Sequence, residues 1–451
     1  MSTRAPDRGN DANAATTVPP SRQPVAGHGA APGQGPSGAR AVALLSALAL
    51  ASAWAIYLPL GSKYLGYLSS ALLAVVVVWQ QRRWPELRRW PPMLAPMALW
   101  LMLVISATWS SAPGSDVLSH CWHYGRMLLM PVISLALPPE VARRGLRHFV
   151  CASVLVAVLT AIERLQLLPW LPLRDFLSSS ADANGHQRIV TSLLLALGAA
   201  IALVQAGIAG QDRHLRIAWL VAAVVVAIGL SLQDRRTGMV ALPLLLAALA
   251  LTRQRSWWRA ALLLGGVLAL AALTWQFSSS VRDRFTEGLG ELKAYQSTGA
   301  VDTSWGMRAR LVDLTLEMVR DKPLLGHGLA SWVSLWRQRA KGGGALLEAH
   351  TSPHSEVLLI ATQAGAVGIV LWIAMLCTYL RQAWRAGRAG EASLLVWTAI
   401  AWSALFTSAI RDAKFALPLL MLAGLALAAS RSTSIGAQGQ SSALRLSAGG
   451  R

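Results

Sequence analysis

Charged residues are scarce in this chain. Asp, Glu, Lys and Arg make up 14% of its 451 residues, whereas hydrophobic residues make up 54%. Soluble domains ordinarily carry about 25% charged residues. This composition excludes a soluble globular protein and indicates a lipid bilayer as the solvent of the chain.

Cysteine is scarce as well. Cys121, Cys151 and Cys377 are far apart in the sequence and form no CxxC pair, which argues against a disulfide framework and against a cysteine metal site. The metal-binding patterns DxD and HExxH are also missing. We therefore expect neither a metal nor any other cofactor, and a reaction that does not depend on metal.

Long apolar runs dominate what is present. About 20 apolar residues are needed to cross the hydrocarbon core as a helix, and about twelve such runs are predicted. The predicted spans are 41–60, 64–80, 91–109, 117–137, 149–164, 189–209, 217–232, 239–252, 260–275, 357–380, 394–410 and 415–430. The predicted fold is an all-α integral membrane domain over residues 41–430.

The net charge of +20 would suggest a nucleic-acid partner in a soluble protein, but the arginines fall mainly in short loops between apolar runs. We therefore expect no nucleic acid and use these arginines to orient the chain. If alternate loops carry the positive charge on the cytoplasmic side, both termini are cytoplasmic. The tails 1–40 and 431–451 lack apolar periodicity and are predicted to be disordered.

One outward-facing segment, residues 276–356, is much longer than the others. Within it Met307, Leu311, Leu314 and Met318 recur at helical spacing, which predicts an amphipathic helix. Pro323 should end this helix near Asp321. One interpretation is that the loop merely caps the bundle, with Trp and Arg side chains as interfacial anchors.

Arginines on the outward side favour a second interpretation. The positive-inside rule disfavours them there, and guanidinium groups present forked donors that match pairs of phosphate oxygens. An outward cluster could therefore hold a diphosphate, although each arginine could also be an interfacial anchor or an ion-pair partner. The arginines of this kind are Arg188, Arg235, Arg236, Arg282, Arg284, Arg308, Arg310, Arg337 and Arg339.

His350 and His354 lie where the long loop re-enters the membrane. A histidine there can take a proton at neutral pH and act as a general base. Either one could instead be a solvated residue, or a turn residue fixed by Pro353. Trp332, in the Trp-bearing segment after the predicted amphipathic helix, is a candidate for contact with an acceptor or for support of the loop.

Arg126 lies inside the predicted span 117–137, three residues after His123 and six after His120. Charge in lipid is costly and is usually functional or paired. Arg126 is therefore predicted either to help bind a lipid diphosphate or to pair with a carboxylate such as Glu163.

Short motifs in this order resemble the superfamily of O-antigen ligases and polymerases. The first is Arg308 followed by an amphipathic run and by the sequence Pro-Leu-Leu-Gly-His-Gly at 323–328. The second is His354 with spaced Leu358, Gly365 and Gly368, although Ser355 and Gln363 depart from the family pattern. Arg236-Thr237-Gly238 resembles a third motif, with Arg235 in place of the usual Ser.

This resemblance implies a metal-independent glycosyltransferase of the all-helical GT-C type in the bacterial inner membrane, with its active site facing the periplasm. The implied donor is an undecaprenyl-diphosphate-linked saccharide. His354 would be the general base for an acceptor hydroxyl, while Arg236 and Arg308 would bind the diphosphate. Arg235, Arg188, Arg310 and Arg126 are supporting candidates, and His350 could share the base role.

The motifs leave the acceptor open. It could be lipid A-core in an O-antigen ligase, another repeat unit in a polymerase, or a protein hydroxyl in an O-oligosaccharyltransferase. A ligase is favoured, because about twelve spans with one dominant loop before the penultimate pair of helices resemble it, and no long C-terminal periplasmic domain follows. The resemblance also implies inversion at the anomeric carbon. A lipid-linked saccharide transporter would be equally apolar, but it would more often show an internal repeat and helices broken at the midplane.

Overall fold

The computed structural model describes residues 36–168, 170, 186–208, 210–233, 236–253, 258, 261, 265, 276, 279–299, 301–342 and 344–431. Within these ranges every regular element is a helix. Eight of the described helices are long and apolar enough to cross a membrane. They are α1 (Pro36–Ala55), α2 (Leu60–Gln80), α4 (Pro91–Ser106) extended by the 3-10 turn η1 (Ala107–Trp109), α7 (Pro139–Arg164), α9 (His186–Ala206), α10 (Arg213–Ser231), α17 (Glu356–Arg385) and α19 (Ala413–Ser430).

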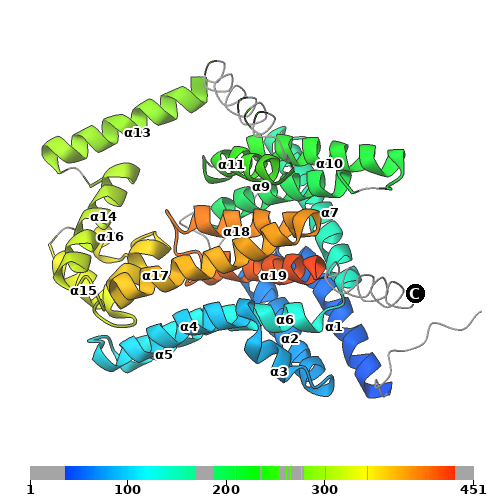
Figure 1. Cartoon of the computed structure of the whole chain (residues 1–451). Coiled ribbons are helices and arrows are strands. Elements are labelled where there is room, and N and C mark those ends of the chain that lie inside the picture. Colours follow the sequence, from blue (N-terminus) through cyan, green and yellow to red (C-terminus); the bar gives the residue numbers. More distant parts are fainter. Residues whose placement is uncertain are drawn as a thin grey trace, which may run out of the picture.

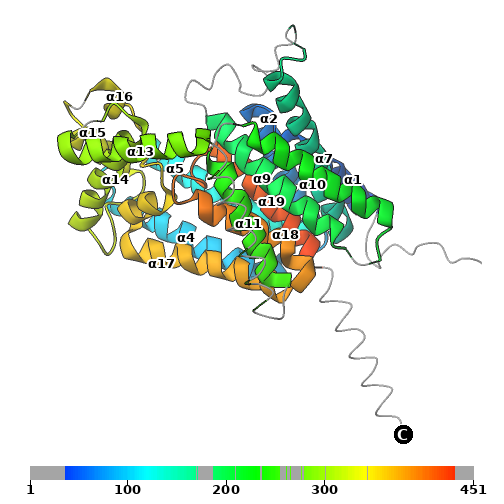
Figure 2. The ribbon, with the colours of Figure 1, turned by 90° about the horizontal axis from the view of Figure 1, so that it is seen from above.

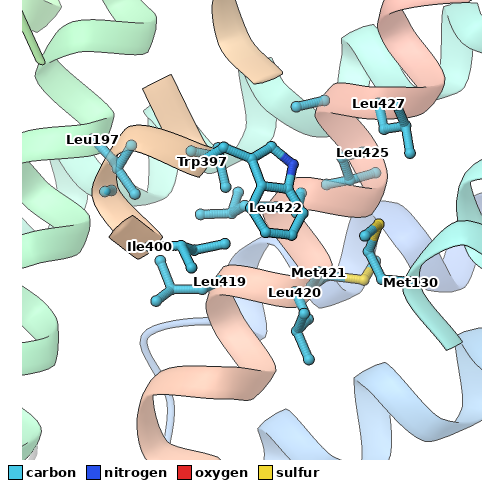
Figure 3. Packing of buried hydrophobic residues seen from close by; sticks show 14 of the residues in the cluster. Met130, Leu197, Trp397, Ile400, Leu419, Leu420, Met421, Leu422, Leu425 and Leu427 are labelled. Carbon is cyan, nitrogen blue, oxygen red and sulfur yellow. The ribbon is translucent and has the colours of Figure 1, made fainter. Parts of the chain in front are cut away.

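The centre of the bundle is formed by α19 and α9, which are buried over almost their whole length. Both are apolar on every face, and a helix of that kind is stable only when other helices cover all of it. Trp397 of the shorter α18 (Glu391–Ser403) lies beside Leu422 and Leu425 of α19, with Met130 and Leu197 in the same cluster (Figure 3). The remaining short apolar helix is α11 (Arg236–Arg253), which packs on α9 and α18.

The predicted span 117–137 is not one uniform α-helix. The segment forms α5 (Gly114–Gly125), the 3-10 turn η2 (Arg126–Leu128) and α6 (Leu129–Ala136). Pro131 offers no N–H to the carbonyl of Met127, and the backbone tightens to a 3-10 turn just before it.

Two other predicted spans have different ends. The run at 394–410 ends as a helix at Ser403, because the backbone beyond it accepts hydrogen bonds from the start of α17: Ala404 O and Thr407 O take the N–H of Glu356. The first span is displaced toward the N-terminus, and α1 begins at Pro36, inside the predicted tail. The predicted span 260–275, apart from residues 261 and 265, lies outside the described residues, as do the rest of the first tail and residues 432–451.

The helices of the long loop, which the sequence predicts to face outward, gather at one end of the bundle, at the left of Figure 1 and Figure 2. They are α13 (Ser279–Thr298), α14 (Ser304–Asp321), α15 (Ser331–Arg339) and α16 (Ala345–Glu348). The amphipathic helix predicted around Met307–Met318 is confirmed as α14, and it ends at the predicted Asp321. Leu311, Leu314 and Met318 face a small core that they share with residues of α15. We call this end of the bundle the loop end.

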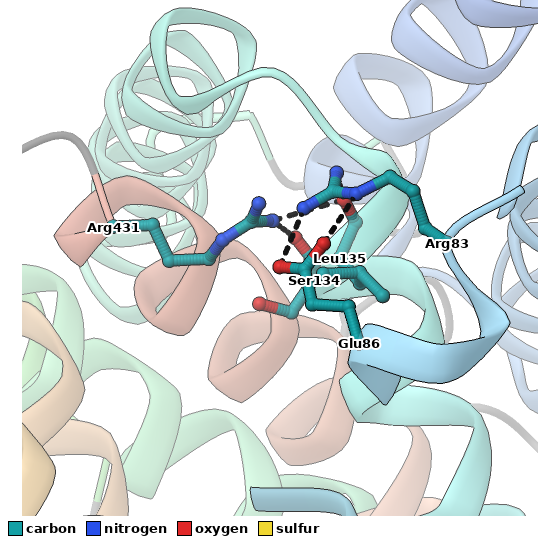
Figure 4. A network of polar contacts seen from close by, with 5 residues as sticks. All are labelled: Arg83, Glu86, Ser134, Leu135 and Arg431. Atoms are coloured by element: carbon teal, nitrogen blue, oxygen red, sulfur yellow. Dashed lines mark hydrogen bonds and ion pairs between the residues drawn. The ribbon is translucent and has the colours of Figure 1, made fainter. Parts of the chain in front are cut away.

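The opposite end is held by polar contacts that join chain segments far apart in sequence. Arg83 donates to Glu86 of α3 (Trp84–Arg89) at 2.8 Å and to Leu135 O at 2.7 Å, and Arg431 donates to Ser134 O at 2.6 Å (Figure 4). Arg253 pairs with Glu391 at 2.7 Å, beside the 3-10 turn η3 (Gly387–Gly390). These arginines belong to the loops that the sequence predicts to face the cytoplasm.

Candidate active site

A tight turn before α17 carries the two histidines that the sequence singles out. His354 has a left-handed backbone, with φ 51°, which is uncommon for residues other than glycine and several-fold enriched in histidine. Its N–H donates to Ser352 Oγ at 3.4 Å. Ser355 then caps α17, because its Oγ accepts the N–H of Leu358 at 3.3 Å. The side chain of His354 is half-buried at the entrance to the bundle.

Aromatic rings connect this turn to the core of the loop helices. The rings of His354 and His350 lie edge to face, 5.5 Å apart, and His350 lies 6.4 Å from Trp336. Trp336 stacks on Trp332 at 5.0 Å. Trp332 is buried and donates from Nε1 to Thr315 Oγ1 of α14 at 3.0 Å. Trp332 thus lies in the loop core, and the structure brings His350 and His354 together.

The Gly-containing turn after α14 packs directly on a break in α17. Gly365 has φ 60° and ψ −153°, a conformation that is essentially limited to glycine. This break frees backbone groups that pair with the turn: Ala366 N–H donates to Pro323 O at 2.8 Å, and His327 N–H donates to Thr362 O at 2.8 Å. The side-chain oxygen of Gln363 accepts the N–H of Ala330 at 3.0 Å. The turn at 323–328 and the break in α17, which belong to two different motifs of the sequence, therefore pack on one another.

Glu356, the first residue of α17, is fully buried. One of its carboxylate oxygens accepts the hydroxyl of Tyr124 at 2.8 Å. The other accepts the backbone N–H groups of Ile410 at 2.8 Å and Arg411 at 3.2 Å. A buried carboxylate is stable only with such partners, so Glu356 fastens the start of α17 to the segment between α18 and α19.

Arg126 binds the same segment from the opposite side. Its guanidinium is fully buried and donates to Arg411 O at 2.8 Å, to Ile410 O at 3.4 Å and to the hydroxyl of Tyr64 at 2.9 Å. Backbone carbonyls and Tyr64, not the predicted partner Glu163, thus satisfy this buried cation. We call the pair of Glu356 and Arg126, which together hold both peptide groups of Ile410 and Arg411, the backbone clamp.

The loop arginines lie on different sides of α14. Residues two apart on an α-helix point in directions about 200° apart, so Arg308 and Arg310 do not face one common ligand from this helix. Arg308 is exposed. Arg310 lines a cavity of about 770 Å³ with Tyr295, Asp313 and Arg339. The hydroxyl of Tyr295 donates to Asp313 at 2.7 Å, and partial burial, followed by that carboxylate, raises the pKa of Tyr295.

The remaining arginine candidates lie at the starts of α9 and α11, two helices that pack on each other. Arg188 is half-buried in the first turn of α9. A Cβ on Gly238 would lie 2.2 Å from Ser192 O, so this glycine permits the close approach of the two helices. Arg236 is the first residue of α11, and its side chain lies outside the described part of the structure, as does Arg235 altogether.

Sequence reasoning missed three residues of this region: Tyr124, Glu356 and Arg411. Two of them had a detectable signal. Glu356 is a carboxylate at the beginning of a long apolar run, where an acidic residue is costly and usually has a role. Arg411 lies in a short loop that the sequence predicts to face outward, where the positive-inside rule disfavours an arginine. In the described part of the chain, no group of three or more His, Cys, Asp or Glu side chains is arranged to hold a metal ion.

Comparison with known families identifies part of the chain. Residues 221–373 match the family model described as O-antigen ligase. The matched segment extends from α10 into the second half of α17, and includes Arg236, α14, the turn at 323–328 and His354. No curated protein matches the chain.

Proposed function

Because residues 221–373 are an O-antigen ligase domain, of a family of lipid-linked saccharide ligases and polymerases, we propose that this membrane protein is an O-antigen ligase. In this proposal it transfers a saccharide from undecaprenyl diphosphate to a hydroxyl of lipid A-core. The reaction takes place at the loop end, which faces the periplasm of the inner membrane, and completes lipopolysaccharide without a metal.

The proposed reaction is a single displacement. His354 takes the proton of the acceptor hydroxyl while the hydroxyl oxygen forms a bond to the anomeric carbon of the donor. The bond from that carbon to the diphosphate oxygen breaks, and undecaprenyl diphosphate leaves with the electron pair. Arg236 and Arg308 offset the charge that develops on the diphosphate. Attack from the face opposite the leaving group inverts the anomeric configuration.

The observation that carries this proposal is the position and backbone of His354. It lies in a left-handed turn at the mouth of the bundle, held by Ser352 on one side and by the Ser355 cap on the other. Non-glycine residues in that conformation cost about 1–3 kcal/mol and cluster at functional sites. The ring of His350 lies beside it.

The proposal is tested by transfer from a purified undecaprenyl-diphosphate-linked saccharide to rough lipopolysaccharide in vitro. We expect His354→Ala to abolish product formation. Arg236→Ala and Arg308→Ala should each lower the rate by about 10²–10³, as does loss of a donor that stabilises charge in the transition state. His214→Ala, an exposed histidine at the start of α10, is the matched control and should retain full activity. Full transfer by His354→Ala would refute the assignment of the base.

The products formed in a deletion strain separate the related functions. Loss of polymer from lipopolysaccharide, with accumulation of lipid-linked polymer, is the result expected of a ligase. Single-repeat products would indicate a polymerase, and loss of glycan from proteins alone would indicate an O-oligosaccharyltransferase. A transporter would leave undecaprenyl-linked material on the cytoplasmic face, with no transfer activity in the purified protein.

A further inference from the structure

Arg411 has one guanidinium nitrogen without a hydrogen-bond partner among the described residues, next to a backbone that four hydrogen bonds hold in place. The backbone clamp fixes both peptide groups of Ile410 and Arg411, as described above. The side chain itself is half-buried, and its Nε is enclosed without a hydrogen-bond partner among the described residues. A buried donor left unpaired costs about 1–3 kcal/mol, and more when it is charged. A ligand that offers an acceptor oxygen to Nε of Arg411 would remove this cost.

A second unsatisfied polar atom lies in the same region. His123 of α5 is half-buried, and its Nδ1 is enclosed without a partner in the described structure. Tyr124, the residue after His123, donates to Glu356, which also accepts the N–H of Arg411, and the rings of His123 and His120 are 5.8 Å apart. The atoms that lack partners therefore come from two elements that meet, α5 and the turn before α19.

Arg411 could instead serve only as a counter-charge for Glu356. The carboxylate of Glu356 already accepts three hydrogen bonds, from Tyr124 and from two backbone N–H groups, and Arg411 forms no ion pair with it within the described residues. A structural counter-charge would be expected to direct its forked donors at the carboxylate. The backbone of Arg411 serves the clamp, whereas its Nε has no hydrogen-bond partner among the described residues.

We propose that Arg411 and His123, with His120 beside them, form a binding site for a phosphate oxyanion at the loop end. Guanidinium and imidazole N–H groups are strong donors to phosphate oxygens. The proposal rests on the proposed function for its preferred ligand, the diphosphate of the undecaprenyl donor. The same chemistry would also bind the phosphate of a membrane phospholipid headgroup.

Direct binding tests this site without requiring turnover. The full-length protein in nanodiscs of phosphatidylcholine is titrated with undecaprenyl diphosphate, and separately with phosphatidylglycerol. We expect Arg411→Ala to raise the Kd for undecaprenyl diphosphate about 10- to 100-fold, the loss typical of a hydrogen bond to a charged group. His123→Ala should weaken binding less. Arg411→Lys should restore binding in part, because lysine keeps the charge but loses the fork.

Arg337→Ala is the matched control. Arg337 is exposed at the end of α15, on the same end of the bundle, and its removal should leave both titrations unchanged. The thermal unfolding midpoint of each variant establishes that the bundle is intact. Loss of phosphatidylglycerol binding alone would support the oxyanion site and assign it to a headgroup. If Arg411→Ala folds and binds both lipids as tightly as the wild type, the site is refuted.

The proposed function and the oxyanion site can be refuted independently of one another. If the wild type binds undecaprenyl diphosphate through Arg411 but transfers no saccharide to lipid A-core, the proposed function is wrong and the oxyanion site stands. If transfer requires His354 while Arg411→Ala leaves the Kd unchanged, the proposed function stands and the oxyanion site is wrong.

Discussion

Glu356 illustrates how one side chain can organise the loop end. Its carboxylate has no contact with water and accepts donors from α5 and from the segment before α19. It is also two residues from His354, so the same contacts fix the position of the histidine turn relative to the bundle. Removing such a carboxylate leaves the buried N–H groups of Ile410 and Arg411 without acceptors, and each group left unpaired costs about 1–3 kcal/mol.

We therefore expect Glu356→Ala to lower the thermal unfolding midpoint of the purified protein strongly. Glu356→Gln should be milder, because its amide oxygen can still accept both N–H groups while Tyr124 turns to accept from the amide nitrogen. Glu140→Ala is the matched control, since that carboxylate is exposed and, among the described residues, pairs with Arg143, a contact worth about 0–1 kcal/mol. Equal midpoints for Glu356→Ala and Glu140→Ala would contradict the role given to the clamp.

At the scale of the element, the break in α17 and the turn at 323–328 form one structural unit. The break at Gly365 opens the hydrogen-bond ladder of a membrane helix, which is tolerated in lipid only where other groups satisfy the backbone. The turn does so through Pro323 O and Leu324 O, which accept the N–H groups of Ala366 and Val367. A Cβ on Gly365 would lie 2.3 Å from Leu324 O, so the glycine is needed for both its conformation and its contact.

Gly365→Ala should consequently reduce the yield of folded protein and lower its unfolding midpoint. Gly387→Ala isolates the conformational part of this effect, because Gly387 also has a positive φ, 58°, but a Cβ there meets no atom within 4 Å. We expect it to cost only about 1–2 kcal/mol, the usual penalty of a side chain in the left-handed region. Similar losses for the two variants, measured by thermal unfolding in detergent, would show that the contact with the turn contributes nothing.

Hydropathy and helical periodicity predicted the helices that are defined by the order of apolar and polar residues within their own sequence. The apolar runs of α2, α9, α17 and α19 are long enough to satisfy the bilayer by themselves, and α14 has one apolar face. The end of α18 at Ser403 depends on a partner about 50 residues away in the sequence, and the hydrogen bonds of the Arg126 guanidinium depend on carbonyls almost 300 residues away. No local pattern contains those contacts, which is also why Tyr124 and Glu356 were missed at the candidate site.

The whole molecule has two chemically different ends. The loop end carries the histidine turn, the cavity beside Arg310 and the clamp around Ile410 and Arg411. The opposite end is held by arginines that bind carboxylates and backbone carbonyls, such as Arg253 with Glu391 and Arg388 with Gly207 O. In Figure 1 the loop helices and the end of α19 lie on opposite sides of the bundle. This separation is the pattern that the positive-inside rule describes, if the loop end faces the periplasm.

Thiol labelling in cells tests that orientation. The free cysteines Cys121, Cys151 and Cys377 are first replaced by serine, and Arg337→Cys or Arg388→Cys is then introduced; both sites are exposed, one on α15 and one on η3. A membrane-impermeant maleimide added to spheroplasts should label the first variant and leave the second unlabelled until the membrane is opened, because only the loop end then faces the reagent. The reverse pattern would place the candidate active site in the cytoplasm, away from the side on which the proposed acceptor is glycosylated.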